Sequence, residues 1–145
     1  MWSVWLVRVL VTSALVAGAS LAYSFQTGPP ATHTGAPFIG GVQAENLCTN
    51  CHGGPANQPG ATLEILDLPE HYHPDSLYTL RVRMSWTHPP PRRWGFQITA
   101  IRQADGQGAG LFDIAGITGL QIQRGSGNFL SRRYVEHTIN GTFAG

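Results

Sequence analysis

The chain contains no lysine, only two cysteines and few charged residues of either sign. Its 145 residues carry nine basic side chains, all arginine, against eight acidic ones, so the formal net charge is +1. This balance offers no basic face large enough to bind a phosphate backbone, and we expect no nucleic-acid partner. The acidic residues are dispersed along the chain, which predicts no general acid/base pair, no calcium loop and no catalytic residue.

Helical periodicity is also missing after the N-terminal region. Residues 78–86 instead alternate strictly between apolar and polar side chains, and residues 94–100 repeat the pattern. A period of two is typical of a strand with one buried face. Shorter runs predict a first strand around 63–68 and a late one over 134–138. Strands at short intervals, separated by turns rich in glycine and proline, predict an all-β antiparallel sandwich or barrel.

The N-terminus carries the longest apolar run. Arg8 precedes the apolar residues 9–22, which end in the small-residue triplet Ser-Leu-Ala. This pattern predicts a signal peptide over 1–22 that is cleaved after Ala22, and therefore an exported protein, periplasmic or extracellular. A retained membrane anchor is the alternative, although about 20 apolar residues are needed to span a bilayer. A cytosolic amphipathic helix is a third interpretation.

Three parts follow from this organisation. After the signal or anchor at 1–22, residues 23–47 consist mainly of Gly, Pro, Ala and Thr and predict a flexible linker, which could pack onto the domain that follows. Residues 48–145 are expected to form the folded domain.

Both cysteines lie in the stretch NLCTNCHGG, where Cys48 and Cys51 are followed directly by His52. In a C-x-x-C-H sequence, two thiols can bind the vinyl groups of one haem through thioether bonds, and the histidine becomes the proximal iron ligand. We therefore expect one covalently attached haem c. A redox disulfide or a zinc site completed by His71 and His73 are the alternatives.

With haem assigned to this motif, further segments resemble the bacterial reelin-like domains, also called choice-of-anchor V domains. The resemblance spans about residues 28–142 and includes GPPATHTGAP before the motif and YVEHTINGT near the end. Its sharpest part is the Arg93–Gln97 segment RWGFQ, which follows a strand that begins with Tyr78–Leu80. The resemblance implies an immunoglobulin-like β-sandwich behind the haem motif.

The sequence departs from that family at its end. Relatives continue with further tryptophan-containing strands and often a C-terminal anchor, whereas this chain stops at Gly145. A sandwich that is truncated there would expose a sheet edge, which a second copy or a partner could cover.

An electron-transfer haem usually needs a sixth iron ligand. The candidates are His33, His71, His73, His88, His137 and Met84. We choose His137 as the distal ligand because it matches the histidine of the family's Y-x-x-H-T segment and falls on a predicted strand end.

The expected function is that of an exported monohaem c-type cytochrome, a one-electron carrier and not an enzyme. Its partners would be redox proteins, with membrane contact only through a retained N-terminal segment or a missing C-terminal anchor. An extracellular binding or adhesion module with structural haem and a haem-based gas or redox sensor are the alternatives.

Overall fold

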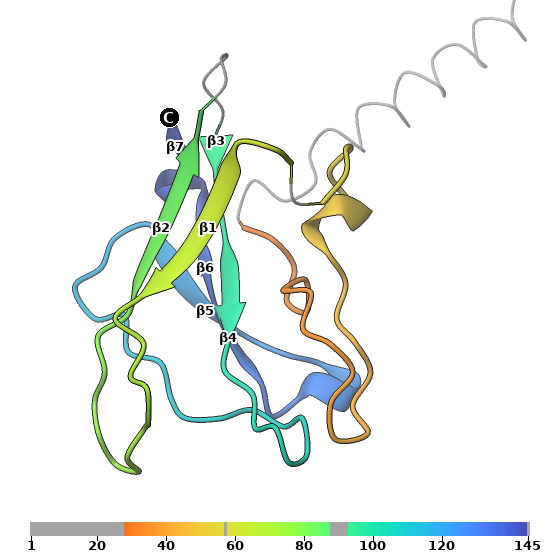
Figure 1. Cartoon of the computed structure of the whole chain (residues 1–145), viewed down its shortest axis with the longest axis vertical. Coiled ribbons are helices and arrows are strands. Elements are labelled where there is room, and N and C mark those ends of the chain that lie inside the picture. Colours follow the sequence, from red (N-terminus) through yellow and green to blue (C-terminus); the bar gives the residue numbers. More distant parts are fainter. Residues whose placement is uncertain (1–27, 57, 88–92, 145) are drawn as a thin grey trace, which may run out of the picture.

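The computed structural model describes residues 28–56, 58–87 and 93–144 (Figure 1). The predicted signal segment at 1–22 and the ligand candidate His88 lie outside the described residues.

Antiparallel strands dominate these ranges, joined by turns and three short 3-10 helices. The strands are β1 (Ala61–Leu66), β2 (Arg81–Trp86), β3 (Arg93–Trp94), β4 (Gln97–Thr99), β5 (Leu120–Arg124), β6 (Arg133–His137) and β7 (Phe143–Ala144). The 3-10 helices are η1 (Cys48–Asn50), η2 (Gly127–Phe129) and η3 (Ile139–Gly141). Strand β1 pairs with β2, β3 with β7, and β6 lies between β4 and β5. This arrangement confirms the predicted all-β class.

The β1–β2 hairpin has one apolar and one polar face. Leu63 pairs with Met84 on the apolar face, while Glu64 forms a 2.6 Å ion pair with Arg83 on the other face. The predicted strand at 78–86 is regular only from Arg81 onward. Pairing stops there because the opposite strand leaves the extended conformation directly after Leu66, where the next residue has a φ of 65°.

Strand β6 is the central strand of the three-stranded sheet and is paired on both sides. Val135 is opposite Ile98 of β4 and Ile122 of β5, which makes one face of this sheet apolar. Tyr134 and Glu136 point to the other face and are fully buried. The predicted late strand is confirmed in β6. The predicted strand at 94–100 is interrupted, because Trp94 belongs to β3, which pairs with β7, and only Gln97–Thr99 form β4. Strand β5 was not predicted.

Residues 28–47 cover the polar face of this sheet, as Figure 1 shows for the orange and gold part of the ribbon. Val42 and Glu45 are buried there, and the Gln97 side-chain amide donates a 3.0 Å hydrogen bond to the carbonyl of Pro30. The segment therefore differs from the flexible linker that its composition predicts. Polar contacts with the sheet hold residues 28–47 in place, although this segment has few large apolar side chains to bury.

Candidate functional site

The C-x-x-C-H motif forms a single tight turn at η1. The backbone N–H groups of Cys51 and His52 donate hydrogen bonds of 3.2 and 3.0 Å to the carbonyl of Cys48. Because side chains three residues apart are eclipsed in a 3-10 turn, Cys48 and Cys51 lie on one side of it. All three motif residues are exposed, and neither cysteine forms a disulfide. The turn therefore offers two free thiols and an adjacent imidazole.

Hydrogen bonds to the preceding segment fix this turn. The Asn50 side-chain oxygen accepts a 3.0 Å bond from the N–H of Leu47, which closes the start of η1. One residue earlier, the Asn46 carbonyl accepts the N–H of Gly35 at 2.9 Å. The Cys48 Sγ lies 3.6 Å from the carbonyl oxygen of His33. The motif is thus tied directly to residues 32–35.

The pKa of the Cys48 thiol gives no sign of an activated nucleophile. Although Cys48 is exposed at the surface, its sulfur is partly desolvated, which raises the pKa of the thiol above its ordinary value, and the neighbouring Cys51 adds to the increase. Cysteines of redox enzymes instead have a lowered pKa, because the thiolate is the nucleophile. An unactivated thiol at Cys48 is compatible with covalent use of its sulfur by a cofactor.

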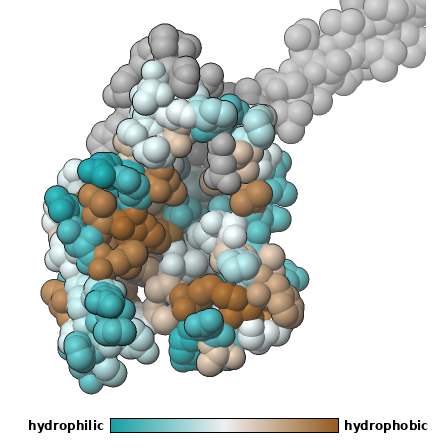
Figure 2. All heavy atoms as spheres, viewed as in Figure 1, coloured by the Kyte–Doolittle hydropathy of each residue, from teal (hydrophilic) through white to brown (hydrophobic). Residues whose placement is uncertain are grey.

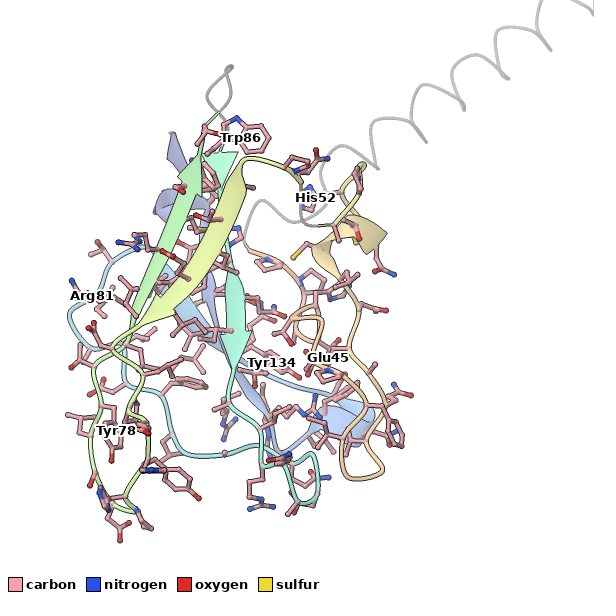
Figure 3. The ribbon with its side chains drawn as sticks, viewed as in Figure 1. Glu45, His52, Tyr78, Arg81, Trp86 and Tyr134 are labelled. Atoms are coloured by element: carbon pink, nitrogen blue, oxygen red, sulfur yellow. The ribbon has the colours of Figure 1, made fainter. Side chains whose placement is uncertain are left out.

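The histidines proposed for zinc do not meet the motif. His73 donates its backbone N–H to the Tyr78 hydroxyl at 2.7 Å. Figure 3 shows Tyr78 at one end of the β1–β2 hairpin and His52 near the other. Within the described ranges, no group of three or more His, Cys, Asp or Glu side chains could hold a metal ion. His73, which contacts Tyr78, accordingly lies away from η1.

An apolar cleft of about 260 Å³ lies between the hairpin and the edge of β4. Figure 2 shows this region as a hollow beside the brown apolar surface of the hairpin. Its apolar lining consists of Leu63, Ile65, Val82, Phe96, Ile98 and Ile101, together with Ala36 from the N-terminal segment. Leu63 is 62% exposed. The cleft therefore presents uncovered apolar surface.

The cleft and the motif are neighbours along the backbone. Thr34 lines the cleft, and the residue before it, His33, contributes the carbonyl that contacts the Cys48 Sγ. A flat apolar group attached to Cys48 would thus start close to a residue that lines the cleft.

His137, the predicted distal ligand, packs against the connection between β3 and β4. Its Nδ1 accepts a 3.0 Å hydrogen bond from the backbone N–H of Phe96. The ring also fills the space beside Gly95, where an added Cβ would lie 2.2 Å from the His137 Cε1. Its role as an iron ligand stays a prediction.

Two other candidates have defined places. His33 donates its backbone N–H to the Gln97 side-chain oxygen at 2.8 Å, so it is held on the sheet. Met84 lies on the apolar face of β2, partly buried, where it pairs with Leu63. Met84 has the position of a packing residue.

A buried polar cluster under the sheet was missed by the sequence analysis. Glu45 accepts a 2.6 Å hydrogen bond from the Tyr134 hydroxyl and one of 2.5 Å from the Thr34 hydroxyl, and it forms an ion pair with Arg132. Figure 3 shows Glu45 and Tyr134 facing one another from the N-terminal segment and β6. Burial tends to raise the pKa of Glu45, but these hydrogen bonds outweigh it and hold the pKa below its ordinary value.

A second buried carboxylate, Glu136, is surrounded by glutamines. Gln97 and Gln121 donate side-chain hydrogen bonds of 2.6 and 2.8 Å to it, and Gln123 donates a third. Burial raises the pKa of Glu136, and the glutamine bonds counter this only in part. Because Gln97 also reaches the carbonyl of Pro30, the cluster joins the sheet to the N-terminal segment. The glutamines at alternate positions of β5 were the available sequence signal.

Comparison with protein-family models, curated proteins and solved structures finds no match to this chain. Within the residues that the structure describes, no helix has the length and hydrophobicity that crossing a membrane requires.

Proposed function

We propose that this chain is an exported c-type cytochrome that carries one haem and transfers single electrons between redox partner proteins. Cys48 and Cys51 would bind the haem covalently, and His52 would be its proximal iron ligand. The observation that carries the proposal is the arrangement of these residues on one exposed turn, tied to the wall of an apolar cleft.

The donor set fits haem c on chemical grounds. Two free thiols on one side of a turn can form two thioether bonds, and the next residue supplies a nitrogen ligand. A redox disulfide is less well supported because the pKa of the Cys48 thiol is raised. A zinc site is less well supported because His73 contacts Tyr78, away from η1.

The chain's own residues would bind and shield the cofactor. When bound, haem would supply reversible one-electron chemistry between ferric and ferrous iron, with redox proteins as donor and acceptor. The cleft residues Leu63, Ile65 and Phe96 would exclude water from the porphyrin, and such an apolar shell influences the redox potential.

The finer fold assignment belongs to the same proposal. The apolar sides of the β1–β2 hairpin and of the β4–β6–β5 sheet would be the two facing layers of an immunoglobulin-like, reelin-like sandwich. The N-terminal segment would be an addition on the polar face of the second layer.

The test is export of the full chain in cells that attach haem to c-type cytochromes, followed by acid-acetone extraction. We expect haem bands to stay with the protein and the intact mass to include one haem. Replacing both cysteines (C48A/C51A) should abolish the covalent bands. An intact mass without haem in the unmodified chain would refute the proposal, and a five-coordinate ferrous spectrum with rapid carbon monoxide binding would favour the sensor alternative.

A further inference from the structure

We infer that His33, and not His137, is the second axial ligand of the iron; the inference rests on the proposed haem attachment. His33 lies beside the C-x-x-C-H motif. Asn46 donates its N–H to the Thr32 carbonyl at 3.1 Å, and Gly35 donates to the Asn46 carbonyl at 2.9 Å. His33 lies between these two bonds, with its carbonyl oxygen 3.6 Å from the Cys48 Sγ.

The hydrogen bonds of the His33 ring define its tautomer. Its Nδ1 lies 3.1 Å from the carbonyl oxygen of Pro30 and 3.1 Å from that of Ala31. Carbonyl oxygens only accept hydrogen bonds, so Nδ1 carries the proton. The neutral ring then has its lone pair on Nε2. A metal-binding histidine typically donates its other ring N–H to a carbonyl or carboxylate in this way, which fixes the ring for coordination.

The His137 ring has the opposite arrangement. A backbone N–H always carries its proton, and the Phe96 N–H is directed at the His137 Nδ1 over 3.0 Å. Although the Phe96 carbonyl oxygen lies 3.1 Å from the same atom, Nδ1 must therefore act as the acceptor. In the neutral ring the proton then resides on Nε2, which leaves no lone pair there for iron. His137 is a histidine that connects β6 to the β3–β4 turn.

His33 is also held in place by the sheet. Its backbone N–H is held by the Gln97 side-chain oxygen, and Gln97 in turn donates to Glu136 and to the Pro30 carbonyl. The next residue, Thr34, lines the apolar cleft. A ligand fixed on the scaffold loses little conformational entropy on binding, in contrast to one on a free linker.

The experiment compares three histidine variants of the haem-loaded full chain: H33A, H137A and, as a matched control, H71A in the exposed loop beyond β1. Intact mass and acid-acetone extraction report covalent haem, while absorption and electron paramagnetic resonance report the spin state. We expect H33A to keep its covalent haem, to change from low spin to high spin, and to regain the low-spin spectrum with added imidazole. The H137A and H71A proteins should stay low spin.

A second variant tests the assignment of His33 even if H33A misfolds. His33→Met keeps a ligand at the same position, so it should stay low spin with a raised redox potential, because a methionine and a histidine ligand together raise the potential. A low-spin H33A protein, a high-spin H137A protein, or an unmodified protein that is high spin would each overturn the assignment of His33. In all of these cases covalent haem would persist, whereas failure of the proposed function would appear as a mass without haem.

Discussion

Glu45 and Arg132 form an ion pair in which both side chains are completely buried, although 87 residues separate them in the chain. The pair joins the N-terminal segment to the residue that precedes β6, and the Arg132 guanidinium also donates two hydrogen bonds to the Gly106 carbonyl. Segment 28–47, which leads directly into the C-x-x-C-H turn, is therefore part of the folded core.

Removing one partner of this pair should strongly destabilise the protein. In Glu45→Gln the Arg132 charge stays buried without its counter-ion, and we expect a loss of about 3–5 kcal/mol in the free energy of unfolding. Urea denaturation measures the change. Glu64→Gln, in the exposed pair with Arg83, is the matched control and should have a much smaller effect. Equal losses in the two variants would contradict the structural role of the buried pair.

The lowered pKa of Glu45 also predicts that the protein loses stability in acid. The pKa of Glu45 is lowered in the folded protein from an ordinary value of 4.5, so its stabilising effect is present above that pH and is lost as the pH falls through the folded pKa. Unfolding measured from pH 6 down to pH 3 should show this decline in the unmodified chain. The decline should be shallower in Glu45→Gln. The same pH slope in both proteins would show that titration of Glu45 does not cause the decline.

Glu136 should have the opposite pH dependence. Its pKa is raised in the folded protein from the same ordinary value, so its contribution is present below pH 4.5 and is lost as the pH rises through the folded pKa. Glu136→Gln removes this titration, although it also replaces an acceptor of three glutamine hydrogen bonds. We expect the difference in unfolding free energy between the two proteins to become smaller as the pH rises from 4 to 7. A difference that is constant over this range would show that Glu136 does not titrate there.

The close contact between Gly95 and His137 predicts a steric effect on stability. In Gly95→Ala the added Cβ would lie between 2.2 and 2.6 Å from three atoms of the His137 ring, so the ring or the turn must move. Overpacking of this kind typically costs about 1–3 kcal/mol. Thermal unfolding measures it, with Gly53→Ala as the control because nothing lies within 4 Å of a Cβ there. If the haem-loaded protein stays low spin while it loses stability, His137 is a packing residue; an unchanged melting temperature would contradict the contact.

A charge in the apolar cleft should change the redox potential of the haem, whereas a charge on a surface away from the cleft should not. Leu63→Asp places a carboxylate on the cleft wall, which should shift the redox potential and the haem absorption bands. Leu111→Asp is the control because Leu111 is 92% exposed and does not line the cleft. Potentiometric titration of both variants makes the comparison. Equal potentials would mean that the porphyrin does not occupy the cleft.

The strands were predictable where one face is apolar and the other polar. The alternation around Val82 and Met84 gave β2, although pairing begins only at Arg81 because the φ of Asp67 turns the opposite chain away. The chemistry of Cys48, Cys51 and His52 could likewise be derived from their spacing. These signals are local, so a single sequence contains them.

The contacts that hold residues 28–47 on the domain could not be predicted, because they depend on distant polar partners. A segment with few large apolar residues has the composition of a linker, and only the fold shows that Arg132 and Tyr134 lie opposite Glu45. For the same reason the sequence placed His33 in a free segment. The hydrogen bonds that select its tautomer come from backbone carbonyls, which no pattern of side chains shows.

Covalent haem attachment at Cys48 and Cys51 is tested by the intact mass of the exported full chain, measured together with its absorption spectrum after acid-acetone extraction. We expect one haem in the mass of the unmodified protein, haem bands that stay with the polypeptide, and neither feature in C48A/C51A. A protein that folds with two unmodified thiols under conditions in which other c-type cytochromes acquire haem would contradict this attachment.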